Sequence, residues 1–178
     1  GARGVLAMDL ELVHPGTDAS AAVQLDTLRL DCLDAARAPI EPGAVLDGCV
    51  ASWNGDALPA PVVFSDAHVL VPLAGHRLEP GESGSIELTL DIEADAPAVG
   101  IELVVGDDHL QASDANLGTP VVVQPADGAP WPGSSGLVRI QPATDEILVE
   151  WTDRLPALLP GGAASVTVAE VVLHHPAA

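Results

Sequence analysis

The chain has 178 residues, a length that fits one large β domain or one domain with a small second unit. Its 26 acidic residues face six arginines and no lysine, and the net charge of −20 disfavours nucleic-acid binding and docking to anionic lipid. No run approaches the roughly 18 apolar residues of a membrane-spanning helix. Because only four residues are aromatic, Val, Leu, Ile and Ala must fill the interior.

The first predicted strand covers residues 6–12. Leu6, Met8, Leu10 and Leu12 alternate with polar or small residues, which is typical of a sheet with one solvated side. A His-Pro-Gly turn follows the strand. We therefore expect these four apolar side chains to share the face that packs on the core.

A second strand is predicted over residues 23–32, and its alternation changes phase midway. Val23 and Leu25 are in one phase, whereas Leu28 and Leu30 are in the other. One inserted residue near Asp26 explains the change, because a β-bulge adds a residue to one strand of a pair.

Further strands follow, separated by turns rich in Gly and Pro. An Asn-Gly dipeptide at residues 54–55 is a strong hairpin signal. The predicted strands are residues 45–53, 62–64, 69–71, 86–92, 99–105 and 120–123. Short strands at this spacing are typical of a β-sandwich.

The best candidate boundary lies at residues 124–136, which read QPADGAPWPGSSG. We interpret them as a linker between a sandwich at 1–123 and a small β segment at 137–178. A segment of that size seldom holds a core alone, so it is expected to pack on the first unit or on a neighbour.

The two cysteines, Cys32 and Cys49, are predicted to form one disulfide, as in proteins of oxidising compartments. The alternative is a pair of buried free thiols.

The turn motifs resemble those of tandem immunoglobulin-like modules in large secreted or surface-anchored bacterial proteins. They are the proline turn after the first strand, the L-x-P-G turn at residues 78–81, and the polar Ser113-Asp114 stretch before the Gly118-Thr119-Pro120 strand start. The resemblance implies an all-β, immunoglobulin-like antiparallel β-sandwich with a smaller C-terminal β segment. It also implies an extracellular or cell-surface location and a role as stalk, spacer, adhesive unit or fibre subunit.

Catalysis is not expected. Acidic residues such as Glu87 and Asp91 alternate with core residues on strands and so face solvent. Ser83 lies in a turn before a strand, where a nucleophile elbow requires a helix.

No cofactor is expected, and calcium is the best candidate ion because extracellular sandwiches often use it to brace loops. Its candidate ligands are Asp107, Asp108, Asp114 and Asn116. The histidines show no metal-ligand spacing and are expected at the surface or at strand ends, namely His14, His68, His76, His109, His174 and His175.

The favoured function is a noncatalytic structural or adhesive module, or a subunit that assembles into fibres or surface layers. In assembly, a strand within residues 165–173, with Val166, Val168, Val171 and Leu173, would add to the sheet edge of another copy or of a neighbouring module. The alternative is an accessory module that binds calcium or carbohydrate for a secreted enzyme. Trp53 and Trp151 would then stack on sugars, with Trp131 as a further platform.

Overall fold

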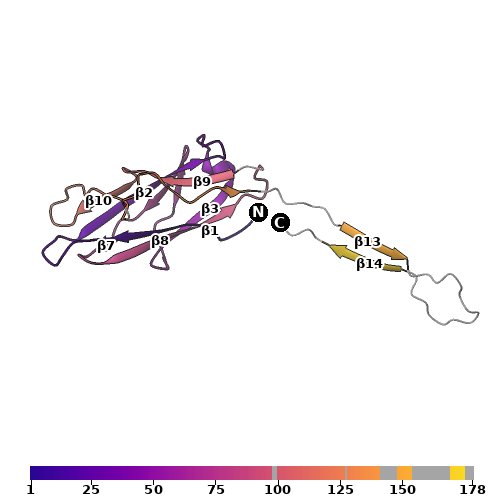
Figure 1. Cartoon of the computed structure of the whole chain (residues 1–178), viewed down its shortest axis with the longest axis horizontal. Coiled ribbons are helices and arrows are strands. Elements are labelled where there is room, and N and C mark those ends of the chain that lie inside the picture. The colour runs from indigo at the N-terminus through magenta and orange to yellow at the C-terminus, as the bar shows by residue number, and fades with distance from the viewer. Residues whose placement is uncertain (98–99, 127, 141–147, 154–168, 175–178) are drawn as a thin grey trace, which may run out of the picture. The chain divides into compact units, whose positions relative to one another are not determined.

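The computed structural model describes residues 1–97, 100–126, 128–140, 148–153 and 169–174. The chain divides into two compact units, Gly1–Pro142 and Ala143–Ala178 (Figure 1). Among the described residues the only helical element is one 3-10 turn, η1 (Pro42–Ala44), and no helix is long and apolar enough to cross a membrane.

The first unit is a sandwich of two antiparallel sheets, which confirms the predicted all-β class. The smaller sheet has the order β1-β8-β3-β4, formed by Val5–Val13, Ser83–Ile92, Leu46–Trp53 and Asp56–Ala57. The larger sheet has the order β11-β9-β2-β6-β5, formed by Gly133–Ser134, Gly100–Val105, Val23–Leu33, His68–Pro72 and Val63–Ser65. Three more strands complete it: β7 (Arg77–Leu78) and β10 (Leu110–Asp114) on β2, and β12 (Val138–Arg139) on β9.

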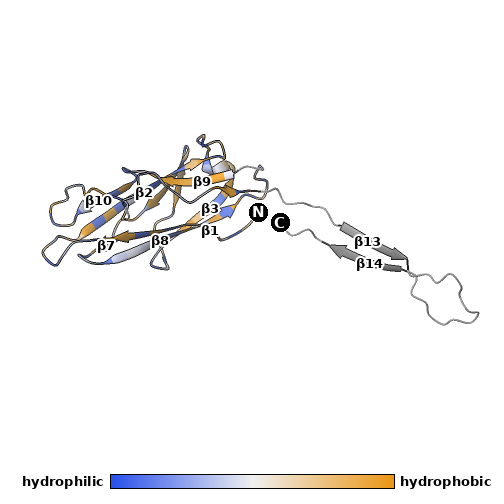
Figure 2. Ribbon diagram, viewed as in Figure 1, coloured by the Kyte–Doolittle hydropathy of each residue, from blue (hydrophilic) through white to orange (hydrophobic). Residues whose placement is uncertain are grey.

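Aliphatic side chains from both sheets fill the interior. Leu28 and Leu30 of β2 meet Ile86 and Leu88 of β8 in one core cluster, and all four are fully buried. Figure 2 shows the hydrophobic residues of β9, which is buried along its whole length. Fully burying an aliphatic side chain stabilises a fold by roughly 1.5–3 kcal/mol. Aliphatic residues therefore dominate the core, and Trp53, Phe64 and Trp131 pack against it while only partly buried.

Two local predictions are confirmed. Thr27 and Leu25 pair with the consecutive residues Gln111 and Ala112 of β10, so Asp26 is an extra residue on β2. The Asn54-Gly55 turn joins β3 to β4, with both residues at positive φ (51° and 85°), as a tight hairpin turn requires.

The face assigned to Leu6 is wrong. A register shift between Leu6 and Met8 places Leu6 on the outer face, where it is 61% exposed. The extra residue breaks the alternation, so of these four residues only Met8, Leu10 and Leu12 face the core.

The C-terminal part of the first unit also differs from expectation. Residues 120–123 form no strand, only a bridge between Ser113 and Pro120, and the partner strand β10 was not predicted. Residues 133–134, inside the expected linker, pair with β9, and Ile140 reaches the core.

The second unit contains a hairpin of β13 (Leu148–Asp153) and β14 (Ala169–His174). Val171 pairs with Trp151, and Leu173 pairs with Val149. Val166 and Val168 lie outside the described residues.

No disulfide joins the cysteines, which are both free thiols. Cys32 is fully buried in β2, and Cys49 is half-buried in β3 against the core. Each cysteine packs as a small apolar side chain, one in each sheet, in agreement with the alternative of two free thiols.

Candidate functional site

The most prominent unpaired feature of the sandwich is the outer edge of β1. This nine-residue strand pairs only with β8, and it is the longest strand in the described part of the chain that has a neighbour on one side only. The outermost strands of the larger sheet, β5 and β11, have three and two residues. Long edges are templates for pairing with another chain, whereas short ones are protected.

Hydrogen bonding shows which residues of β1 present free backbone groups. Glu11 lies opposite Ser85, but the Ser85 carbonyl accepts from the Asn54 N–H (2.9 Å) and the Ser85 N–H donates to Asn54 Oδ1 (2.8 Å). Glu11 and Ser85 are therefore a non-hydrogen-bonded pair. Hydrogen-bonded and non-hydrogen-bonded pairs alternate along an antiparallel ladder, so Leu10 and Leu12 bond to β8. The N–H and C=O groups of Asp9, Glu11 and Val13 point to the free edge.

The core is partly open along this edge. Leu10 and Leu12 face inward but are only half-buried, whereas their partners Ile86 and Gly84 on β8 are buried. A further strand beside β1 would cover these two leucines. The edge therefore combines unpaired backbone with incompletely buried apolar surface.

Carboxylates line the outer side of the same edge. Asp9 and Glu11 are exposed, and Asp9 lies directly opposite Glu87. None of the carboxylates of Asp9, Glu11 and Glu87 forms an ion pair within the described ranges. Asp9 and Glu11 also line an open hollow of about 280 Å³ together with Asn54 and residues 83–85.

The start of β1, by contrast, is electrostatically satisfied. Arg3 contacts Asp47 at 2.6 Å and Asp91 at 3.0 Å, and the Gly4 N–H donates to Asp91 Oδ1 at 2.8 Å. The Gly4 N–H and the Arg3 guanidinium together hold the pKa of Asp91 below its usual value. These contacts fix the position of β1 against β8 and β3.

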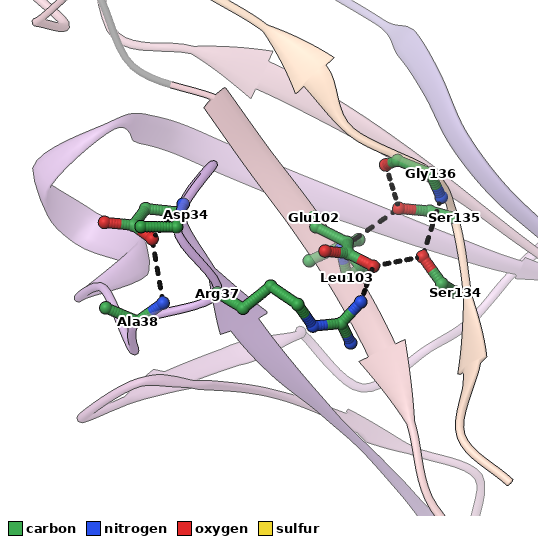
Figure 3. Close-up of polar contacts among 9 residues, drawn as sticks. Asp34, Arg37, Ala38, Glu102, Leu103, Ser134, Ser135 and Gly136 are labelled. Carbon is green, nitrogen blue, oxygen red and sulfur yellow. Dashed lines mark hydrogen bonds and ion pairs between the residues drawn. The ribbon is translucent and has the colours of Figure 1, made fainter.

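A second polar group surrounds the buried Glu102 of β9 (Figure 3). Ser134 Oγ donates to Glu102 Oε1 at 2.6 Å, and Arg37 Nη1 donates to the same oxygen at 3.2 Å. Ser135 exchanges two hydrogen bonds with the Leu103 backbone, at 2.9 and 3.0 Å. The serines thus fasten residues 133–136 to β9, which is a structural task.

A third polar group surrounds Asp31 on the larger sheet. Asp31 Oδ1 lies 2.9 Å from His68 Nδ1, 3.7 Å from His109 Nε2 and 3.8 Å from Arg29 Nε. His109 is buried and lies directly before β10, at a strand end. Throughout the described residues, no three His, Cys, Asp or Glu side chains converge to hold a metal ion, and the Arg29 guanidinium would repel one here.

The candidate calcium ligands do not form one site. Asp107 and Asp108 precede β10, whereas Asp114 ends it and Asn116 follows, so the strand separates the two pairs by roughly 13 Å. Asp114 Oδ1 accepts the N–H groups of Asn116 and of the next residue at 2.8 and 2.9 Å. Asp108 Oδ1 instead lies 3.4 Å from Arg29 Nη2.

The tryptophans occupy three different settings. Trp53 packs on the core and against the His76 ring (centroids 5.3 Å apart), which leaves it poorly placed as a sugar platform. Trp151 lies in β13 of the second unit. Trp131, half-buried, lines an open groove of about 480 Å³ with Asp107 and parts of residues 122–130.

Sequence reasoning did not find the β1 edge, the Glu102 group or the Asp31 group, because each depends on pairing between distant segments. For the β1 edge, the sequence signal was the alternation of acidic with apolar residues at 6–12. Comparisons with models of known protein families, with curated proteins and with solved structures find no significant match.

Proposed function

We propose that the chain is a noncatalytic structural or adhesive module of an extracellular or surface protein, of the immunoglobulin-like type, that joins a neighbour by β-strand addition at β1. The observation that carries this proposal is the nine-residue β1 edge, which is paired on one side only.

Strand addition matches what this edge offers. A docked strand would bond to the backbone groups of Asp9, Glu11 and Val13, and each such hydrogen bond contributes about 0.5–1.5 kcal/mol net. The alternate side chains of that strand would cover Leu10 and Leu12, which are half-buried. Main-chain bonds would supply affinity, and apolar contacts would set register.

The polar groups support a noncatalytic role. Glu102 accepts hydrogen bonds from Arg37 and Ser134, which hold a loop to β9, and Asp31 lies within ion-pair distance of Arg29 and His68 on the larger sheet. The hollow beside Asp9 and the groove beside Trp131 are both open to solvent.

The test uses the whole chain and a neutral nine-residue peptide that alternates valine and glutamine. A second peptide of the same sequence carries N-methyl groups on alternate backbone nitrogens, so that it cannot complete a ladder. We expect the first peptide to bind and the methylated one to lose binding, measured by fluorescence anisotropy. Equal binding of the two peptides, or binding of neither, would contradict strand addition.

A second candidate is carbohydrate binding at the groove that the half-buried Trp131 lines, because an indole ring can stack on a sugar. Binding of soluble oligosaccharides that is lost in Trp131→Ala, but kept in Asp107→Asn, would support it. Flat titrations with a polysaccharide panel would argue against it.

A further inference from the structure

The side chains that flank the β1 edge restrict what can dock there. Asp9 and Glu11 project from the outer face of β1, with Glu87 opposite Asp9 on β8. Like charges directly opposite each other destabilise a sheet, and no described cation compensates these three. The edge therefore lacks positive charge at the place where a docked strand would lie.

A second copy of this chain cannot supply that charge. Suppose that β1 pairs antiparallel with β1 of another copy, in a register that keeps the core-facing residues of both strands on the same side. Outer-face residues then lie opposite one another, for example Asp9 opposite Glu11. The chain has no lysine, and no two of its six arginines are two residues apart, which is the spacing of Asp9 and Glu11. Its own strands β13 and β14 carry Glu150, Asp153 and Glu170.

We propose that the β1 edge accepts an extended strand of a different protein, in which apolar residues alternate with lysine or arginine. This inference rests on the proposed function, because it names the partner of the same edge. The apolar residues of the partner strand cover Leu10 and Leu12 on the inner side. Its cations pair with Asp9 and Glu11 on the outer side, while the backbone of those two residues and of Val13 completes the ladder.

The experiment compares three nine-residue peptides on the whole chain. All alternate valine with one other residue, which is lysine, glutamine or glutamate. We expect the lysine peptide to bind most tightly, the glutamine peptide less tightly and the glutamate peptide least. Added salt should reduce the advantage of lysine, because exposed ion pairs are screened.

Paired variants separate the edge from the general negative charge of the chain. Asp9→Asn combined with Glu11→Gln removes two charges at the edge, whereas Asp18→Asn combined with Asp95→Asn removes two exposed charges elsewhere. The edge variant should bind the lysine peptide about three- to tenfold more weakly than the wild type, and the control within about twofold.

The outcomes distinguish the two proposals. If both double variants lose the same amount of affinity for the lysine peptide, or if the wild type binds the three peptides equally, the basic-strand inference is overturned and strand addition still stands. Undiminished binding of an N-methylated lysine peptide overturns strand addition itself, since charge alone would then hold the peptide. We expect weaker binding of the lysine peptide to the edge variant, and weaker binding of the N-methylated lysine peptide to the wild type.

Discussion

The two cysteines show how strongly the interior of the sandwich disfavours charge. Burial raises the pKa of Cys32 to about 12, helped by the nearby Cys49, and burial likewise raises the pKa of Cys49 to about 12. Both side chains face the core from different sheets, since Cys32 pairs with Leu103 and Cys49 pairs with Leu90. In this setting the thiolate is the disfavoured form.

Both thiols should therefore react slowly in the folded chain. At pH 8 a pKa of about 12 leaves about a thousandfold less thiolate than the ordinary value of 9.0, and the thiolate is the nucleophile. The measurement is the rate of a thiol–disulfide reagent on native and urea-unfolded chain, with Cys49→Ala to isolate Cys32. Native rates equal to unfolded rates would contradict the buried environment.

The same pKa values predict how stability depends on alkaline pH. Between about pH 9 and 12 the unfolded thiols lose protons that the folded thiols retain, so the free energy of unfolding falls as pH rises. The slope approaches about 1.4 kcal/mol per pH unit for each thiol. Urea unfolding of the wild type and of Cys32→Ala across this range checks the slope, which should be shallower in the variant.

Gly84 is a residue at which one methyl group matters. A Cβ there would overlap the indole ring of Trp53, which packs against His76. We expect Gly84→Ala to displace that ring and to lower the free energy of unfolding by about 1–3 kcal/mol. Gly48→Ala is the matched control, because its nearest neighbour atom would be 3.8 Å away, and equal urea midpoints for the two variants would refute the argument.

Among the elements, β9 depends on a segment that follows it by some thirty residues. Residues 133–136 are held to β9 through Glu102, Ser134 and Ser135. This contact closes one side of the larger sheet. It explains why the first compact unit continues to Pro142.

Removing the buried carboxylate should loosen this segment. Glu102→Ala leaves the Ser134 hydroxyl without its acceptor and is expected to cost about 1–3 kcal/mol, whereas Glu102→Gln, which keeps an acceptor, should cost less. Urea unfolding gives the magnitude, and hydrogen exchange of residues 133–136 gives the location. Equal stability of Glu102→Ala and wild type would show that the contact contributes nothing.

Predictions from sequence succeeded where short-range chemistry decides the structure. The phase change at Asp26 and the Asn54-Gly55 turn are local, and the sequence predicted both. The strand β10 was missed because Leu110 and Ala112 alone mark its inner face. The partners of Glu102, and the free side of β1, depend on pairing between distant segments, which no local pattern reports.

At the scale of the whole molecule, negative charge and strand exposure act together. A net charge of −20 keeps copies apart at low salt, and the acidic residues on β1 add a local penalty against its self-pairing. The same charges favour a basic partner strand. The long edge can thus remain open in the isolated chain and still be selective.

The most direct test of this account is residue-resolved hydrogen exchange of β1 in the whole chain, with and without the valine–lysine peptide. We predict that the amides of Asp9, Glu11 and Val13 exchange fast in the free chain and slow markedly with the peptide, while Leu10 and Leu12 are protected throughout. Protection of all five amides in the free chain, or no change at saturating peptide, would contradict the claim that β1 is a free edge that accepts a strand.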